Sequence, residues 1–542
     1  MMRADKADKP FPCYFFNFAY LFCIGYLHSM IYPFKFLRIG KYLCAVLSVS
    51  TLLFSCNSPK KQREIVLFES YCASCHITPD INSLPRAIWS EKILPEMGAR
   101  LGIRDSGYNP YKGLPFVEME AVIKTGIFPD KPMLDKKDWE LLKAYIIANA
   151  PDSLEAGTGG SSPLELSQFT PNRITLDSTK GTMFTYMEFE QDPERLLLGD
   201  IYGNLSQYNF SDKQNRRIGR FGSPVVSVGK DGENMMVTAI GSIRPSELNT
   251  GRLFQVNPDT IKVIPEALHR PVHVLAHDFD KDGINELIVS EFGDIKGQLS
   301  LLKKSTEKGV YTKHGLLYQP GIIKVELRDM NRDGNEDLVV LTAQGDEGIT
   351  ILYNEKGLKF RPEKVIRFSP VYGTSGFQLI DYDHDGDDDL ITVHGDNADK
   401  SFVSKPYHGM RIHINDGENG FSEAYFYPLN GATGVEAMDF DGDGDIDIAL
   451  VASFPDYQNK PDFSFVYLEN KNELNFNFSE FTFKDSTIGR WFLIDTGDVD
   501  FDGDVDIILS SFTYAFTPVP RSFSDRWNEE NVDIMVLKNN LN

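Results

Sequence analysis

The amino-acid sequence predicts two different folds in one chain: a small all-α domain, and after it an all-β propeller of about seven four-stranded blades. Three observations lead to this prediction. A Cys-x-x-Cys-His motif at residues 72–76 lies in a segment with helical character, a stretch rich in Gly, Ser and Pro follows residue 150, and acidic loops then recur at intervals of 51 to 59 residues. We therefore expect four segments: an N-terminal extension and signal peptide over 1–55, a helical domain over 56–150, a linker over 151–170 and the propeller over 171–542.

Length and charge limit the possible functions. A chain of 542 residues is too long for one ordinary hydrophobic core, and its 42% of hydrophobic residues is typical of globular domains. The net charge is −23, whereas a protein that binds nucleic-acid phosphates needs clusters of Lys and Arg. We therefore expect no nucleic acid among the partners.

The N-terminal segment has the order of a secretory signal. Lys35, Arg38 and Lys41 precede an apolar run, LCAVLSVSTLLFSC, which ends at Cys56. The run resembles the signal of bacterial lipoproteins, which implies that Cys56 is lipidated, becomes the mature N-terminus and attaches the chain to a membrane. The alternative is an uncleaved anchor helix, although the run is shorter than the ~20 residues that span a bilayer. Both readings predict an exported protein, located in the periplasm or on the cell surface.

The exported part has only two cysteines after Cys56. They are Cys72 and Cys75, and His76 follows directly. Cys-x-x-Cys-His is the attachment motif of c-type haem, in which two thiols bond to the porphyrin and the imidazole binds its iron. The segment resembles a class I cytochrome c, which implies covalently bound haem c with His76 as the proximal ligand. A thioredoxin-like redox pair is the alternative, but such a pair occurs next to a βαβ unit, whereas these flanks look helical.

The sixth ligand of the iron has two methionine candidates. Met133 lies just before a predicted helix that has Asp135 as its N-cap and apolar residues at helical spacing. In the cytochrome family the axial Met precedes such a C-terminal helix, so the resemblance favours Met133, with Met97 as the rival. Either methionine could instead pack in the core, and an open iron is the third possibility. A Met ligand would favour electron transfer, and an open iron would favour small-molecule or peroxidase-like chemistry.

Five acidic loops share one pattern, at 278–286, 329–337, 381–389, 439–447 and 498–506. Side-chain oxygens at positions 1, 3, 5 and 9, with a backbone carbonyl at position 7, can surround one Ca²⁺, and Gly at position 6 permits the turn. The expected ligands are Asp278, Asp280, Asp282 and Glu286; Asp329, Asn331, Asp333 and Asp337; Asp381, Asp383, Asp385 and Asp389; Asp439, Asp441, Asp443 and Asp447; and Asp498, Asp500, Asp502 and Asp506. The pattern resembles the FG-GAP or VCBS repeat of integrin-like propellers. The alternatives are solvated turns without metal, or Mg²⁺, which prefers to keep its waters.

Each loop is followed at once by a β-type apolar run, which suggests one propeller blade per repeat. Two further blades without the full loop are expected near 196–209 and 225–241, which brings the count to about seven. The last strand, DIMVLKNN, can pair with an early strand such as RITLD, and this pairing would close the ring.

The sequence contains no Ser-His-Asp order, no zinc spacing and no phosphate-binding glycine loop. We therefore expect an electron carrier with covalent haem, whose calcium-stabilised propeller binds a redox partner protein, a glycan or another protein ligand. One alternative is a cell-surface adhesion propeller with an auxiliary haem. Another is a haem-dependent oxidoreductase.

Overall fold

The computed structural model describes residues 59–104, 107–155, 163–305, 310–396, 401–471, 475–514 and 517–541. The predicted signal segment and Cys56 lie outside these residues. No helix in the described part of the chain has both the length and the apolar character needed to cross a membrane.

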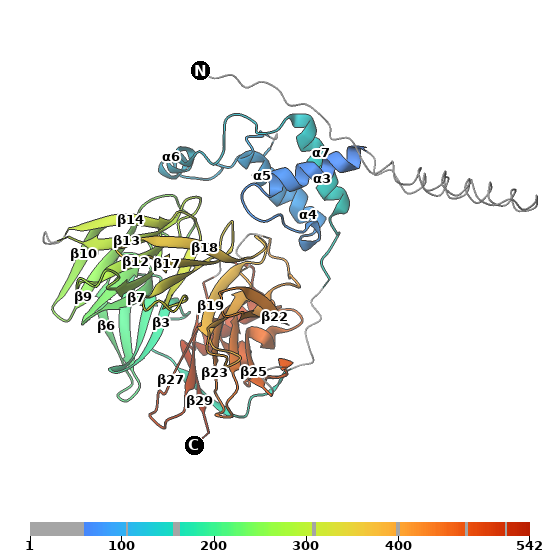
Figure 1. Ribbon diagram of the computed structural model, residues 1–542. Coiled ribbons are helices and arrows are strands. Elements are labelled where there is room, and N and C mark those ends of the chain that lie inside the picture. Colours follow the sequence, from blue (N-terminus) through green and yellow to red (C-terminus); the bar gives the residue numbers. More distant parts are fainter. Residues whose placement is uncertain are drawn as a thin grey trace, which may run out of the picture. The chain divides into compact units, whose positions relative to one another are not determined.

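Helices and turns make up the described residues from 59 to 155 (Figure 1). The segments are α3 (Pro59–Cys72), a 3₁₀ turn η1 (Ile81–Ser83), α4 (Arg86–Ile88), a π-helical turn η2 (Trp89–Ile93), α5 (Leu94–Arg100), α6 (Phe116–Thr125) and α7 (Lys136–Asn149). Helix α7 begins as predicted, because the Asp135 carboxylate accepts the backbone N–H groups of Lys137 and Asp138 at 2.9 and 3.0 Å.

The core of this helical region lies between its longest helices. Trp139, Leu142 and Ile146 lie on one face of α7 and are each 1% exposed. The ring of Phe68 in α3 packs against that of Tyr145 in α7, with centroids 6.0 Å apart. The first and last helices of the region are therefore held together, and the first of them ends in the Cys-x-x-Cys-His motif.

Seven sheets follow, each with four antiparallel strands, and they form the blades of a propeller. Blades 1 to 3 consist of β3 (Phe184–Gln191), β4 (Glu194–Asp200), β5 (Asn204–Asn209) and β6 (Gln214–Arg220); β7 (Val225–Asp231), β8 (Asn234–Ala239), β9 (Gly251–Asn257) and β10 (Thr260–Leu268); and β11 (Pro271–His277), β12 (Glu286–Glu291), β13 (Gln298–Lys304) and β14 (Tyr311–Leu317).

Blades 4 to 6 consist of β15 (Ile322–Arg328), β16 (Asp337–Thr342), β17 (Gly348–Asn354) and β18 (Phe360–Arg367); β19 (Thr374–Ile380), β20 (Asp389–His394), β21 (Gly409–Asn415) and β22 (Phe421–Pro428); and β23 (Ala432–Met438), β24 (Asp447–Ala452), β25 (Phe465–Asn470) and β26 (Phe478–Thr482). Blade 7 consists of β27 (Trp491–Gly497), β28 (Asp506–Ser511), β29 (Ile534–Asn539) and β2 (Phe169–Ile174). The predicted count of about seven four-stranded blades is confirmed.

The first strand of each blade is the innermost one. First strands of successive blades contact one another around the whole ring, from β3 and β7 to β27 and β3. The blades approach closely there, since a Cβ on Gly229 of β7 would lie 2.6 Å from the carbonyl oxygen of Val274 in β11. The second strands, which the apolar runs predicted, are buried along their whole length in blades 3 to 7. Side chains between neighbouring sheets therefore form the core.

Two N-terminal strands complete the ring. Strand β2 pairs antiparallel with β29, from Phe169 opposite Asn539 to Ile174 opposite Ile534, so the predicted closure is present and begins earlier than RITLD. Strand β1 (Leu164–Glu165) runs parallel to β26 as a fifth strand of blade 6. The structure thus places β1 and the start of β2 inside the segment that we expected to be linker. It also contains a helix that the sequence did not predict, α8 (Arg521–Glu530), between β28 and β29.

Candidate metal and cofactor sites

Each of the five acidic loops joins the first strand of a blade to the second, in blades 3 to 7. In every loop the position-1 carboxylate accepts the backbone N–H of the position-6 glycine, at 2.7 to 3.2 Å. That glycine has a φ of 82° to 99°, a left-handed conformation that favours glycine over other residues. Position 4 is also left-handed, with φ of 58° to 73°, although only one of the five residues there is glycine. The loops therefore share one backbone conformation, as their common sequence pattern predicted.

In four loops this conformation brings carboxylates together. At least one oxygen from each of three acids lies within 4.8 Å of the others in Asp278, Asp280 and Asp282; Asp381, Asp383 and Asp385; Asp439, Asp441 and Asp447; and Asp498, Asp500 and Asp506. The blade 4 loop has an amide at position 3, and the side-chain oxygen of Asn331 accepts the backbone N–H of Asp333 at 2.9 Å.

The blade 5 loop gives a test of whether these residues fit a divalent cation. One carboxylate oxygen each of Asp381, Asp383 and Asp387 is buried without a hydrogen-bond partner. Burial and the neighbouring Asp385 charge raise the pKa of Asp387. A Ca²⁺ ion bound by these oxygens would remove both the missing contacts and the repulsion, so the residues fit that ion. The sequence pattern assigned only a backbone carbonyl to position 7, and the Asp387 carboxylate is a ligand candidate that it missed.

The position-9 acids are buried at the start of each second strand. One oxygen of each accepts the backbone N–H of loop position 2, at 2.9 to 3.2 Å. Burial raises the pKa of Asp337, Asp389 and Asp506 to about 6 and that of Asp447 to about 7. These acids therefore stabilise the turn in addition to being candidate ligands.

The second oxygen of the position-9 aspartates reveals a feature that the sequence did not suggest. It accepts the backbone N–H of an asparagine that ends the third strand of the blade, when the strands are counted outward from the centre of the ring. The side-chain amide of the same asparagine donates to the carbonyl of loop position 8, at 3.0 to 3.3 Å. We call this pair of bonds the asparagine clasp; its members are Asn354, Asn415, Asn470 and Asn539 in blades 4 to 7. The clasp follows its aspartate by 17, 26, 23 and 33 residues, so a search for a fixed period cannot find it.

The Cys-x-x-Cys-His motif lies at the end of α3. Cys72 is half-buried and Cys75 is exposed, and both are free thiols. Burial raises the pKa of the Cys72 thiol to about 11. A thioredoxin-like pair needs the opposite, a thiol with a lowered pKa, so the geometry disfavours that alternative.

His76 has one ring nitrogen available for a ligand. Its Nδ1 lies 2.7 Å from the carbonyl oxygen of Ile77. A carbonyl can only accept, so Nδ1 carries the proton and Nε2 keeps a lone pair. This is the arrangement of an imidazole that binds a metal through Nε2.

The two candidate methionines occupy different surroundings. The Tyr71 hydroxyl donates to the carbonyl oxygen of Met133 at 3.5 Å, which brings the segment with Met133 beside the residue that precedes Cys72. The side chain of Met133 is 57% exposed. Met97 lies in α5 and is partly buried. The structure therefore links Met133 to the motif helix through Tyr71.

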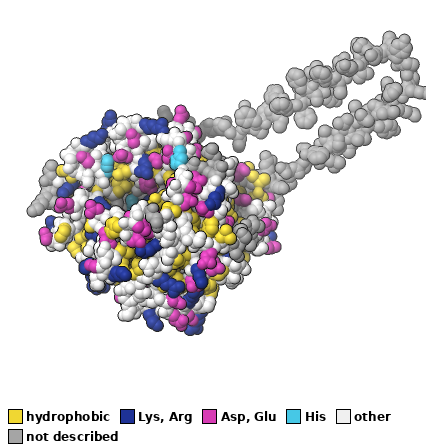
Figure 2. Space-filling model, turned by 90° about the horizontal axis from the view of Figure 1, so that it is seen from below, with side chains coloured by type: hydrophobic (Ala, Val, Ile, Leu, Met, Phe, Trp, Pro, Cys, Tyr) yellow, Lys and Arg dark blue, Asp and Glu magenta, His cyan; other side chains and the backbone are white. Residues whose placement is uncertain are grey.

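A groove of about 520 Å³ lies between blades 7 and 1. Tyr208 and Phe210 line it and pack edge to face, with ring centroids 5.2 Å apart. Phe501, from the acidic loop of blade 7, also lines the groove and is 55% exposed. Lys538 lines it as well and bonds to Asp500 at 2.6 Å. Aromatic faces combined with a few charged groups are typical of ligand sites. On the face shown in Figure 2, Lys and Arg side chains are interspersed with Asp and Glu.

Comparison with known proteins agrees with the repeat pattern. The model of a family described as FG-GAP-like repeat matches residues 329–392, which include the complete acidic loops of blades 4 and 5. The chain is thus a seven-bladed β-propeller that carries FG-GAP-like repeats, and the resemblance expected from the loops is confirmed over those residues.

No curated protein matches the chain. Among solved structures it is similar to one titled YCF48 bound to D1 peptide, with a TM-score of 0.40 and 8% identity over 70% of this chain and 98% of that one. It is also similar to the beta-propeller domain of Cps50 (Swd1) from Myceliophteria thermophila, with a TM-score of 0.39 and 10% identity over 61% of this chain and 95% of that one. The assignment of the propeller rests on the seven sheets themselves.

Proposed function

We propose that this chain is an exported electron carrier in which the helical region holds one covalently bound haem c and the propeller, stabilised by Ca²⁺, binds a partner. The observation that carries the proposal is the motif at the end of α3. Its two thiols are free, burial raises the pKa of the Cys72 thiol to about 11, and His76 keeps Nε2 available. When bound, haem supplies an iron that accepts and releases one electron at a time.

A few residues of the helical region would hold that group. Cys72 and Cys75 would form the thioether bonds, and His76 Nε2 would bind the iron. The bond from His76 Nδ1 to the Ile77 carbonyl fixes the orientation of the ring. The contact of Tyr71 with the Met133 carbonyl supports Met133 over Met97 as the sixth ligand.

The test is whether pigment stays on the polypeptide. The chain is expressed for export in cells with a haem-ligation system, and the purified protein is extracted with acidic acetone. We expect colour to remain on the wild-type polypeptide and to be lost from the Cys72→Ser, Cys75→Ser double variant. The matched control is Cys56→Ser, which removes the predicted lipid site and should keep the haem. Complete extraction of pigment from the wild-type protein would exclude covalent haem.

The calcium part of the proposal rests on the acidic loops. The side chains that would bind Ca²⁺ are those at positions 1, 3, 5 and 9 of the loops in blades 4 to 7. Ca²⁺ would hold each turn by cancelling the repulsion among its carboxylates. An ion that binds only the folded state adds stability by mass action.

The proposed location, anchored to a bacterial membrane through lipid on Cys56, is tested by the same Cys56→Ser variant, which should move from the membrane fraction to the soluble fraction.

The groove between blades 7 and 1 favours a second candidate function, in which the propeller is an adhesion module and the haem is auxiliary. An exposed aromatic ring, that of Phe501, beside charged side chains suits a glycan or a protein segment. Binding of the wild type and variants to an array of immobilised glycans and envelope proteins distinguishes the two functions. Binding that survives loss of both motif thiols and disappears in Phe501→Asp supports adhesion, whereas binding that requires the haem supports electron transfer.

A further inference from the structure

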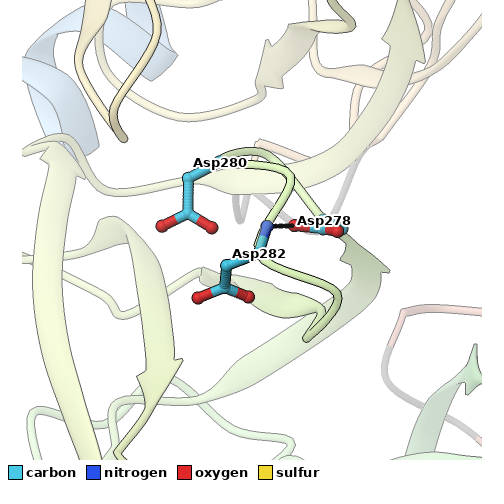
Figure 3. A group of neighbouring side chains, drawn as sticks. All are labelled: Asp278, Asp280 and Asp282. Atoms are coloured by element: carbon cyan, nitrogen blue, oxygen red, sulfur yellow. Dashed lines mark hydrogen bonds between the residues drawn. The ribbon is translucent and has the colours of Figure 1, made fainter.

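The acidic loop of blade 3 already contains a positive charge. Lys303 of β13 places its Nζ 3.0 Å from Asp282 Oδ2 and 3.1 Å from Glu286 Oε1, and it also bonds to Asp280 Oδ2. Figure 3 shows the Asp280 and Asp282 carboxylates on the same side of the loop, while the Asp278 carboxylate turns toward the backbone nitrogen of Asp282. One ammonium group thus contacts three of the four side chains that were expected to bind calcium in this loop.

The same position holds different residues in the other blades. In blade 3 the first residue after loop position 9 is Leu287, which pairs with Leu302 in the third strand, and Lys303 is the next residue. The same register in blades 4 to 7 gives the residues that correspond to Lys303: Tyr353, Ile414, Glu469 and Lys538. Tyr353, Ile414 and Glu469 carry no positive charge. Lys538 is the exception, but within its loop it bonds to Asp500, and the structure gives no bond from it to Asp498 or Asp506. Blade 3 is therefore distinct in having its ligand set bridged by a lysine.

Two more features of blade 3 fit this difference. Position 9 is Glu286 rather than aspartate, and Lys304 occupies the place of the clasp asparagine. In the other four blades the second oxygen of the position-9 acid accepts a backbone N–H from that asparagine. In blade 3 the second oxygen of Glu286 accepts the Lys303 ammonium instead. The lysine thus takes the place of one of the two bonds of the clasp, the bond to the second oxygen of the position-9 acid.

We propose that the Lys303 ammonium is the resident cation of loop 278–286, so that blade 3 folds without Ca²⁺ while the loops of blades 4 to 7 bind it. The inference rests on the proposed calcium sites. Its physical basis is that the ammonium is covalently tethered next to the carboxylates, so it loses little translational freedom when it binds them. A calcium ion would have to displace three charge-assisted hydrogen bonds to enter.

The experiment counts calcium ions per chain by equilibrium dialysis of the full-length protein. We expect Lys303→Gln to bind one more Ca²⁺ than the wild type. Lys304→Gln, which changes the next residue of the same strand, should bind the wild-type number. Lys303→Met, which keeps the aliphatic stem, repeats the gain if the glutamine variant folds poorly.

The converse variant places a lysine where a calcium loop has none. Glu469→Lys in blade 6 should lose one Ca²⁺, and Glu469→Gln should keep it. Equal, non-zero counts in the wild type and the Lys303 variants would overturn the inference while leaving the other calcium sites intact. If no variant and no wild-type protein binds Ca²⁺, both the inference and the proposed calcium sites are wrong.

Discussion

The buried carboxylate of Asp447 should be among the most stabilising polar groups of blade 6, even without metal. It is 0% exposed and accepts three hydrogen bonds, from Phe440 N at 3.2 Å, Asn470 N at 2.8 Å and the Tyr467 hydroxyl at 2.7 Å. Asp447→Ala leaves all three donors buried without a partner, and each such loss destabilises a protein by about 1–3 kcal/mol. Water that enters the vacated space restores part of this, and so does the removal of a buried ionised carboxylate whose pKa is raised to about 7, so we expect a net loss of roughly 2–3 kcal/mol in the free energy of unfolding.

The assay is a urea titration at pH 8 with EDTA present, followed by tryptophan fluorescence. EDTA separates the contribution of the hydrogen bonds from that of any bound ion. The control is Asp443→Ala in the same loop, because Asp443 is exposed and accepts one backbone bond, from Asp445 at 3.1 Å. We expect the control to lose less than about 1 kcal/mol. A loss that small in Asp447→Ala would show that the hydrogen bonds of the position-9 acids contribute little.

Three further outcomes are expected. Chelation should lower the melting temperature of the propeller and Ca²⁺ should restore it, since saturation at a hundred times Kd adds about 2.7 kcal/mol per site; an unchanged melt would contradict bound metal. In EDTA, burial raises the pKa of Asp447 from 3.8 to about 7, so the folded state takes up a proton as the pH falls. The wild type should therefore gain about 2 kcal/mol relative to Asp447→Asn between pH 8 and pH 5.5, measured by paired urea titrations; a constant difference would refute the raised pKa. In the haem-loaded protein, Met133→Leu should abolish the methionine-to-iron charge-transfer band and lower the midpoint potential, whereas Met97→Leu should leave both unchanged; the reverse result would make Met97 the ligand.

The local sequence was sufficient to predict the acidic loops and the strands that follow them. Asp at positions 1 and 5, Asp or Asn at position 3 and Gly at position 6 impose one turn. An uninterrupted apolar run such as IALV after Asp447 has to be buried on both faces. Both signals lie within a dozen residues, so they need no knowledge of the rest of the fold. The same holds for α7, whose Asp135 cap and apolar spacing are contiguous.

The missed features depend on pairing between strands. Lys303 lies on β13 and bonds to Asp280 in the loop before β12. Each clasp asparagine bonds to its acidic loop from another strand, and the number of residues between the two differs from blade to blade. Strand β1 joins blade 6 across most of the chain, beside Phe481 and Thr482. Nothing in the local sequence indicates such partners, because the register of a sheet is set by the whole fold.

Closure of the ring by β2 and β29 also governs how the molecule is made. Strand β29 lies between β2 and β28, so both lack their shared neighbour until residues 534–539 have been synthesised. A nascent or prematurely terminated chain is an open arc with two bare strand edges, which are templates for aggregation. Removal of β29 should therefore be far less well tolerated than changes in the turns between strands.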